Sequence, residues 1–119
     1  MRVLIVDDDP GVGRLLRTVL ERDGNEAVLA EDGEHGWREL TGAAPPQLLI
    51  LDRMLPDMDG ADLLARLRAD ARGADLPVLM LTAAVHASGD LADGTLTRVL
   101  AKPFDLADFR AALRDLRAG

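Results

Sequence analysis

The sequence predicts an α/β protein in which helices cover both faces of one parallel, five-stranded sheet. Short apolar runs alternate with stretches of helical periodicity along the chain, and polar residues directly follow several of the runs. The 119 residues suit a single domain, which we expect to span 1–119. Five strand–helix units suit the flavodoxin-like (βα)5 three-layer sandwich, with strand order 2-1-3-4-5.

The first unit begins with a strand over residues 2–6, an apolar run that ends at three consecutive acids. Asp9 followed by Pro10 is typical of a helix start, because the Asp9 side chain can cap free N–H groups and proline fits the first helical position. The following helix has its apolar residues at helical spacing, namely Val12, Leu15, Leu16, Val19 and Leu20.

The second unit has the weaker pattern. We expect a strand over residues 26–30. Trp37 and Leu40 mark the buried face of a short helix, which Gly42 and a later proline pair bring to an end.

The third strand is expected over residues 47–51, and Asp59 in the turn after it is expected to cap the third helix. The buried face of that helix is expected to consist of Leu63, Leu64 and Leu67. Its solvated face is expected to carry Arg66, Arg68 and Arg72.

Two further strands are expected over residues 77–81 and 98–101. Between them, residues 84–97 hold two glycines and few large apolar side chains, which predicts a short or irregular fourth helix. Asp105 is expected to cap the last helix. The buried face of that helix is expected at Leu106, Phe109, Leu113 and Leu116.

Composition and charge exclude several functional classes. The formal net charge of −7 argues against direct binding of nucleic acid or of anionic membranes. The chain contains no cysteine, so it has no disulfide or thiol chemistry. No apolar run reaches membrane-spanning length, and the N-terminus becomes acidic at Asp7, too early for a secretory signal. We therefore expect a cytoplasmic protein.

Three acids are expected to converge at the carboxyl edge of the sheet. Asp7 and Asp8 follow the first strand and Asp52 follows the third, and these strands are neighbours in the predicted order. Carboxylates this close repel one another and raise one another's pKa values unless a cation is present. Hard oxygen ligands at a site open to water suit Mg²⁺.

Thr82 follows the fourth strand and Lys102 follows the fifth, which adds a hydroxyl and an ammonium group to the same edge. Thr82 alone would more often be a turn hydroxyl, and Lys102 alone a solvated cation. Together with three acids and a metal ion, however, they can hold a tetrahedral anion beside a carboxylate. This combination predicts phosphoryl transfer, in which cations neutralise the phosphoryl oxygens and a carboxylate is the nucleophile.

These residues resemble the receiver domain of two-component response regulators, and the resemblance covers essentially the whole chain. Each motif is weak alone, but four motifs in order, each after its own strand, make the resemblance specific. The motifs are VDDDP at 6–10, LDRMLPDMDG at 51–60, LTA at 81–83 and KPF at 102–104.

The resemblance implies a role for each residue at the predicted site. Asp52 matches the phosphoacceptor of the family, and Lys102 matches its phosphate-binding lysine. Thr82 matches the hydroxyl that bonds the phosphoryl group and moves on activation. The family usually has a cis peptide between this lysine and the next residue, here Pro103.

The resemblance also implies a set of Mg²⁺ ligands. These are Asp7, Asp8, Asp52 and the backbone carbonyl of Met54. Asp8 matches the direct ligand of the acidic pair, and Asp7 matches the acid that acts largely through water.

The implied function is signalling. A sensor histidine kinase or a phosphotransfer protein would donate the phosphoryl group to Asp52, and an output domain, a partner protein or a second copy of the chain would respond. The domain would catalyse only its own phosphorylation and dephosphorylation, and so would not be an enzyme in the usual sense. Two alternatives stay open: an interaction module that ignores phosphorylation, and a phosphatase of the haloacid dehalogenase kind. In the phosphatase, an aspartate should stand where Met54 is.

Two features depart from the usual family pattern. Val99 stands where many members carry an aromatic switch residue, and valine is too small and too stiff at χ1 for an inward and outward swing. The segment from Thr82 to Lys102 is also a couple of residues shorter than usual. Both lie on the face that the family uses for dimerisation or output.

Overall fold

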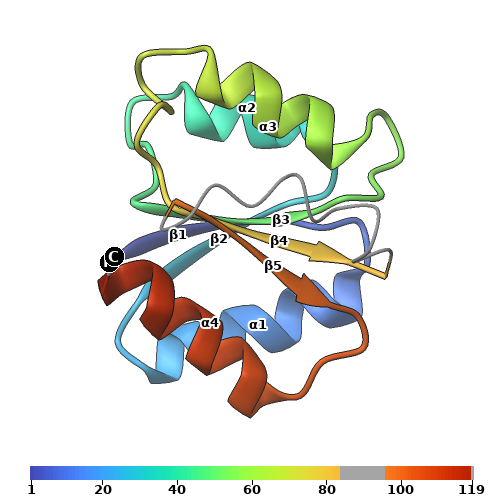
Figure 1. Ribbon diagram of the computed structural model, residues 1–119, viewed down its shortest axis with the longest axis vertical. Helices are drawn as coiled ribbons and strands as arrows, with labels where there is room; N and C mark the ends of the chain where they lie inside the picture. Colours follow the sequence, from blue (N-terminus) through green and yellow to red (C-terminus); the bar gives the residue numbers. More distant parts are fainter. Residues whose placement is uncertain (84–95, 119) are drawn as a thin grey trace.

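All five expected strands form, each within one residue of its expected range. The computed structural model describes residues 1–83 and 96–118. The strands are β1 Arg2–Val6, β2 Glu26–Ala30, β3 Leu48–Asp52, β4 Val78–Thr82 and β5 Thr97–Ala101. They pair in parallel in the order β2-β1-β3-β4-β5, which confirms the predicted flavodoxin-like order (Figure 1).

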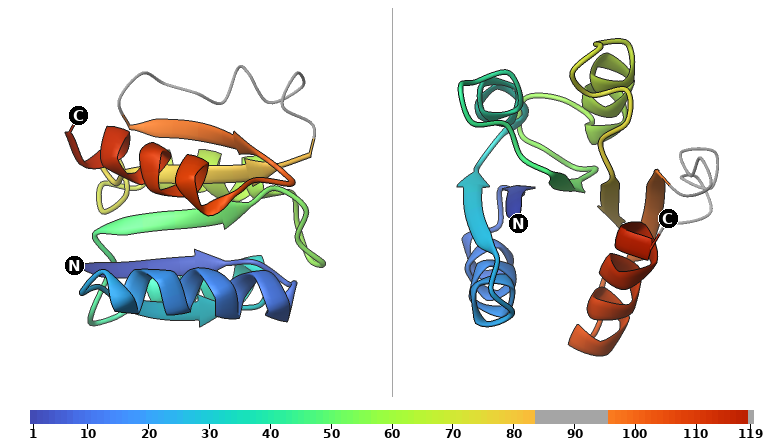
Figure 2. Two further views of the ribbon diagram at one scale, coloured as in Figure 1. Left: turned by 90° about the horizontal axis from the view of Figure 1, so that it is seen from below. Right: turned by 90° about the vertical axis from the view of Figure 1, so that its left-hand side faces the viewer.

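Helices cover both faces of this sheet. The helices in the described residues are α1 Pro10–Arg22, α2 Gly33–Leu40, α3 Gly60–Arg68 and α4 Leu106–Ala118. Helices α1 and α4 lie on one face, and α2 and α3 lie on the other (Figures 1 and 2). The prediction of a short or irregular helix at 84–97 falls almost entirely outside the described residues. Within the described ranges, no helix has both the length and the apolar composition needed to cross a membrane.

The predicted capping acids begin three of these helices. Asp9 accepts hydrogen bonds from two amides at the start of α1, and Asp59 accepts one at the start of α3. Asp105 accepts one from the first turn of α4. Local sequence therefore decides where these helices start, and with it the length of each loop at the carboxyl edge of the sheet.

Alternating strand residues build two cores. In β3, Leu48 and Ile50 pack with residues of α1 and α4, whereas Leu49 and Leu51 pack with residues of α2 and α3. All five residues of β3 are buried, as expected for a central parallel strand covered on both faces. The strand is thus a firm support for Asp52 at its end.

Asp52 and Thr82 are the last residues of their strands, whereas the sequence predicted that they would follow the strands. Asp52 is the last residue of β3 and pairs with Leu81, and Thr82 is the last residue of β4 and pairs with Ala101. The apolar runs stop at Leu51 and Leu81, but backbone pairing continues for one more residue in each strand. Asp52 and Thr82 are therefore held by the sheet itself.

The prediction of a solvated arginine face on α3 is wrong for Arg68. Its guanidinium donates to the carbonyl oxygens of Gly73 (2.9 Å), Leu76 (2.6 Å) and Leu96 (3.3 Å), and to the Thr97 hydroxyl (2.7 Å). Arginine was expected in solvent because of its charge, but here backbone carbonyls and a hydroxyl replace water around it.

The other two arginines are exposed, as predicted. The Arg66 guanidinium lies 4.0 Å from the centre of the Trp37 ring, in a cation–π contact between α3 and α2. Arg72 lies beyond the end of α3 and pairs with Asp70 at 2.8 Å.

Candidate functional site

The structure brings the three predicted acids together at the ends of β1 and β3. The side chains of Asp7 and Asp52 are only 1% and 7% exposed, whereas the next residue along from Asp7, Asp8, is exposed. Asp7, Asp8 and Asp52 can each offer a carboxylate oxygen, and these oxygens lie within 4.8 Å of one another. Adjacent pairing of β1 with β3 produces this cluster.

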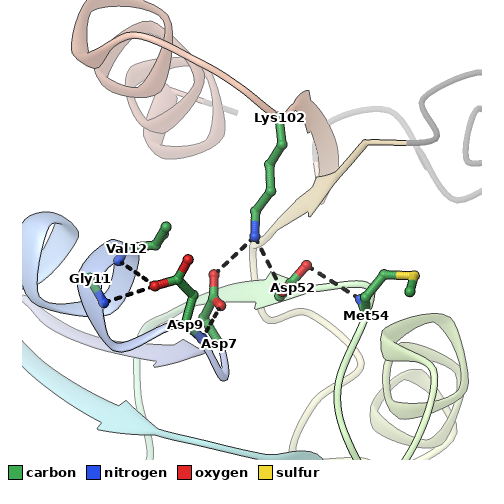
Figure 3. A network of polar contacts seen from close by, with 7 residues as sticks. All are labelled: Asp7, Asp9, Gly11, Val12, Asp52, Met54 and Lys102. Atoms are coloured by element: carbon green, nitrogen blue, oxygen red, sulfur yellow. Dashed lines mark hydrogen bonds and ion pairs between the residues drawn. The ribbon is translucent and has the colours of Figure 1, made fainter.

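Lys102 reaches the two buried acids from the end of β5. Its Nζ lies 3.2 Å from Oδ2 of Asp7 and 3.2 Å from Oδ2 of Asp52 (Figure 3). Its backbone N–H donates to the carbonyl of Thr82 at 3.0 Å. The peptide between Lys102 and Pro103 is cis, which confirms the expectation from the family resemblance.

Backbone N–H groups orient the two buried carboxylates. The Asp9 N–H donates to Oδ1 of Asp7 at 2.9 Å, and the Met54 N–H donates to Oδ1 of Asp52 at 3.3 Å (Figure 3). Asp9, predicted to be structural, also caps α1. Each acid thus keeps one oxygen on the backbone and directs the other towards Lys102.

The charges at this edge are unbalanced. Burial raises the pKa of the Asp52 carboxyl, repulsion from Asp7 raises it further, and Lys102 only partly opposes both effects. Burial alone would lower the pKa of the Lys102 ammonium, but Asp7 and Asp52 outweigh burial and hold that pKa above its usual value. The lysine therefore stays charged, and Asp52 is costly to ionise.

The donor set fits a hard divalent cation. Three carboxylates and one ammonium leave an excess of two negative charges. Mg²⁺ prefers oxygen ligands and keeps several waters, which the exposed Asp8 side of the cluster admits. A cavity of about 500 Å³, lined in part by Asp7, Asp8 and Asp9, keeps that side accessible.

The structure places Thr82, the predicted phosphoryl-bonding hydroxyl, and Val99, which stands at the usual aromatic switch position, on the neighbouring strands β4 and β5. Thr82 is buried at the end of β4, and β4 lies between β3 and β5, whose ends carry Asp52 and Lys102. Val99 lies in β5, pairs with Met80 and packs partly buried on the α2 and α3 side of the sheet. The roles themselves stay predictions.

Comparison with known proteins agrees with this arrangement. The family model for the response regulator receiver domain matches residues 3–114. The chain belongs to the response regulator receiver domain family. As a receiver domain, it is a module of two-component signalling.

One relative of this receiver domain is the DNA-binding dual master transcriptional regulator RpaA of Synechocystis sp. The two sequences are 41% identical over 117 residues, and the aligned region covers 97% of this chain and 48% of RpaA. The chain therefore spans about half the length of that relative.

Two similar solved structures contain magnesium. Response regulator TrrA of Thermotoga maritima, in complex with Mg²⁺-BeF, matches with a TM-score of 0.80 and 29% identity over 97% of both chains. The receiver domain of sensor histidine kinase PA1611 of Pseudomonas aeruginosa, with a magnesium ion in its active site cleft, matches with a TM-score of 0.83 and 26% identity, covering 99% of this chain and 98% of that one.

The sequence did not predict the contact that Asp57, in the loop after β3, makes with the start of α2. Asp57 accepts hydrogen bonds from the backbone N–H groups of Gly33 and Glu34, at the start of α2. These partners are 24 and 23 residues away in the sequence, so no local pattern indicates the contact.

Proposed function

We propose that this receiver domain, formed by residues 1–119, accepts a phosphoryl group on Asp52 from a phosphohistidine donor in a reaction that needs Mg²⁺. The observation that supports this most is the position of Lys102, whose Nζ lies 3.2 Å from both Asp7 and Asp52. The donor is a sensor histidine kinase or a phosphotransfer protein, and the exchange takes place in the cytoplasm.

The reaction joins Asp52 to phosphorus. An oxygen of its carboxylate attacks the phosphorus atom, a new O–P bond forms, and the bond from phosphorus to the imidazole nitrogen breaks with its electron pair on the nitrogen. Lys102 neutralises one phosphoryl oxygen, and the Thr82 hydroxyl donates a hydrogen bond to another. Hydrolysis reverses the state: a water oxygen attacks phosphorus, the P–O bond to Asp52 breaks with its electron pair on the carboxylate oxygen, and inorganic phosphate leaves while the proton from water passes to solvent or to the phosphate.

The metal ligands are the three clustered acids and one backbone group. Asp7, Asp8, Asp52 and the carbonyl of Met54 would hold Mg²⁺, with Asp7 acting largely through water. When bound, Mg²⁺ supplies positive charge that offsets the phosphoryl oxygens. The excess of negative charge among these acids supports this assignment.

The acyl phosphate acts as a signal. It places roughly two negative charges where one carboxylate stood, which biases the domain between two conformations. An output domain, a partner protein or a second copy of the chain responds, and the domain itself makes no direct contact with nucleic acid. The two buried acids, Asp7 and Asp52, and the lysine that pairs with both favour this role over a module that ignores phosphorylation, because simple docking does not require such a cluster.

Intact mass measurement tests the proposal. We expect incubation with Mg²⁺ and acetyl phosphate, a small phosphodonor, to add the mass of one phosphoryl group to the wild type. The gain should be absent in Asp52→Asn and when EDTA replaces Mg²⁺. Asp62→Asn, at an exposed acid in the first turn of α3, is the matched control and should gain the same mass as the wild type. No gain in the wild type, or a gain that survives Asp52→Asn, would contradict the proposal.

A further inference from the structure

The loop between β3 and α3 is closed at its base. The Gly60 N–H donates to the Arg53 carbonyl at 2.6 Å, and Met54 forms an antiparallel bridge with Asp59. Arg53 Nε also lies 3.4 Å from the Asp59 carboxylate. These contacts hold the two ends of the loop together and leave residues 55–58 outside the closed base. The closed base touches the site directly, because the Met54 N–H donates to Asp52 (Figure 3).

Asp57 ties the far end of this loop to α2. Its Oδ1 accepts from the Gly33 N–H at 2.8 Å, and its Oδ2 accepts from the Glu34 N–H at 3.0 Å. Met58 packs against the same place, since a side chain at Gly33 would collide with it. Hydrogen bonds to an ionised carboxylate are among the stronger ones in proteins, so this tether is firm.

Helix α2 also has an N-cap residue directly before it in the sequence, Asp32. Asp32 accepts a hydrogen bond from the His35 N–H at 2.8 Å, as an N-cap residue does. The Asp32 side chain does not take the N–H groups of Gly33 and Glu34, which donate to Asp57 instead. Asp57 therefore completes the cap of α2 and, with the same two hydrogen bonds, fixes the β3–α3 loop to that helix.

We propose that Asp57 is a positioning residue for the Mg²⁺ site, holding the β3–α3 loop against α2 so that the backbone of Met54 stays beside Asp52. This inference rests on the proposed function, in which the Met54 carbonyl is a metal ligand. The Met54 side chain is 76% exposed and gives the loop little anchorage of its own. Its backbone position therefore depends on the closed base of the loop and on the tether at Asp57.

A titration with Mg²⁺ alone, followed through backbone amide shifts in NMR, tests this role in the full chain. The variants are Asp57→Ala and the matched control Asp32→Ala. Each loses one negative charge and one carboxylate that caps α2, but only Asp57→Ala releases the loop. We expect the Mg²⁺ dissociation constant to rise roughly tenfold in Asp57→Ala, as for other residues that support metal ligands, and to change less than about twofold in Asp32→Ala.

Two further readouts separate positioning from stability. Amide hydrogen exchange at Gly33 and Glu34 should accelerate in Asp57→Ala, and thermal unfolding should show both variants folded at the titration temperature. Asp57→Asn keeps the shape and one acceptor, so its dissociation constant should lie between those of the wild type and Asp57→Ala. If Asp57→Ala does not fold, Asp57→Asn against Asp32→Asn gives the same comparison.

The possible results discriminate clearly. Equal dissociation constants for the wild type and the Asp57 variants, or an equal loss in the Asp57 and Asp32 variants, would overturn the role of Asp57 and leave the Mg²⁺ site intact. A wild type that does not bind Mg²⁺ would overturn the proposed function, and this inference with it.

Discussion

The two edges of the sheet both hold buried or partly buried charged groups, but the partners of these groups differ. At the carboxyl edge, Asp7 and Asp52 share the single ammonium of Lys102, and Asp8 lies beside them. At the amino edge, the guanidinium of Arg68 donates to three backbone carbonyls and a hydroxyl. Neutral acceptors can replace the water around a cation, whereas several anions around one cation continue to repel one another.

This difference separates a structural cluster from the cluster that we propose to be functional. The contacts of Arg68 join the end of α3, the loop before β4 and the start of β5, so they stabilise the fold. At the carboxyl edge the pKa of Asp52 is raised by burial and by repulsion from Asp7, so the ionised Asp52 carboxylate costs free energy there. A divalent cation would remove that cost, which ties the charge imbalance to the proposed chemistry.

Arg68→Met should have the largest effect on stability. The substitution removes the guanidinium donor from the Leu76 carbonyl and the Thr97 hydroxyl, and one of two donors from the Gly73 carbonyl, at a cost of about 3 kcal/mol of unfolding free energy. Denaturant unfolding measures this. Arg66→Met, which loses only an exposed cation–π contact, should cost less than about 1 kcal/mol. Similar losses in both variants would mean that the amino-edge cluster is not special.

Lys102→Met should have an intermediate effect that depends on metal. In EDTA at neutral pH it leaves Asp7 and Asp52 repelling each other, at a cost of about 1–2 kcal/mol, reduced because the lysine side chain is 26% exposed. Mg²⁺ should restore more stability to this variant than it adds to the wild type, as thermal unfolding with and without Mg²⁺ would show. Lys102→Arg keeps the charge and should lose less. A loss that Mg²⁺ leaves unchanged would indicate that Lys102 acts by packing.

The sequence predicted the carboxyl edge far better than the amino edge. Apolar runs located the strands, and the parallel order then placed Asp7, Asp52 and Lys102 together, because strand ends are fixed in sequence. The partners of Arg68 are backbone groups, which every residue possesses, so no residue pattern could indicate them. No residue pattern indicates the partners of Asp57 either, because its carboxylate accepts hydrogen bonds from two backbone N–H groups of a helix distant in the sequence.

The end of β3 shows a second limit of sequence reasoning. The apolar run stops at Leu51, yet Asp52 still pairs with Leu81 in the sheet. Hydrogen bonding along a strand does not depend on side-chain polarity, so an apolar run underestimates strand length where a functional acid ends it. The sequence therefore placed the acid at the correct edge but did not reveal how deeply the sheet holds it.

Asp52→Asn should have the smallest effect, and its sign tests the contrast most directly. The folded-state pKa of Asp52 lies above its usual value, so the folded state binds this proton more tightly than the unfolded state does. Its stabilising contribution is therefore complete below the unfolded pKa and is lost as pH rises through the folded pKa. Asparagine is neutral throughout, so in EDTA the stability of the variant relative to the wild type should increase as pH rises through the folded-state pKa of Asp52.

Denaturant unfolding of Asp52→Asn and wild type from about pH 4 to pH 7.5 measures this gain. Asp62→Asn, at an exposed acid outside the carboxylate cluster, is the control for the loss of one acidic side chain. If Asp52→Asn is instead less stable than the wild type near neutral pH, attraction to Lys102 outweighs burial and the repulsion from Asp7. The carboxyl edge would then resemble the satisfied cluster around Arg68, because the charge imbalance would cost nothing. A gain that grows with pH shows that the domain keeps an energetically costly carboxylate where a cation and a phosphoryl group would use it.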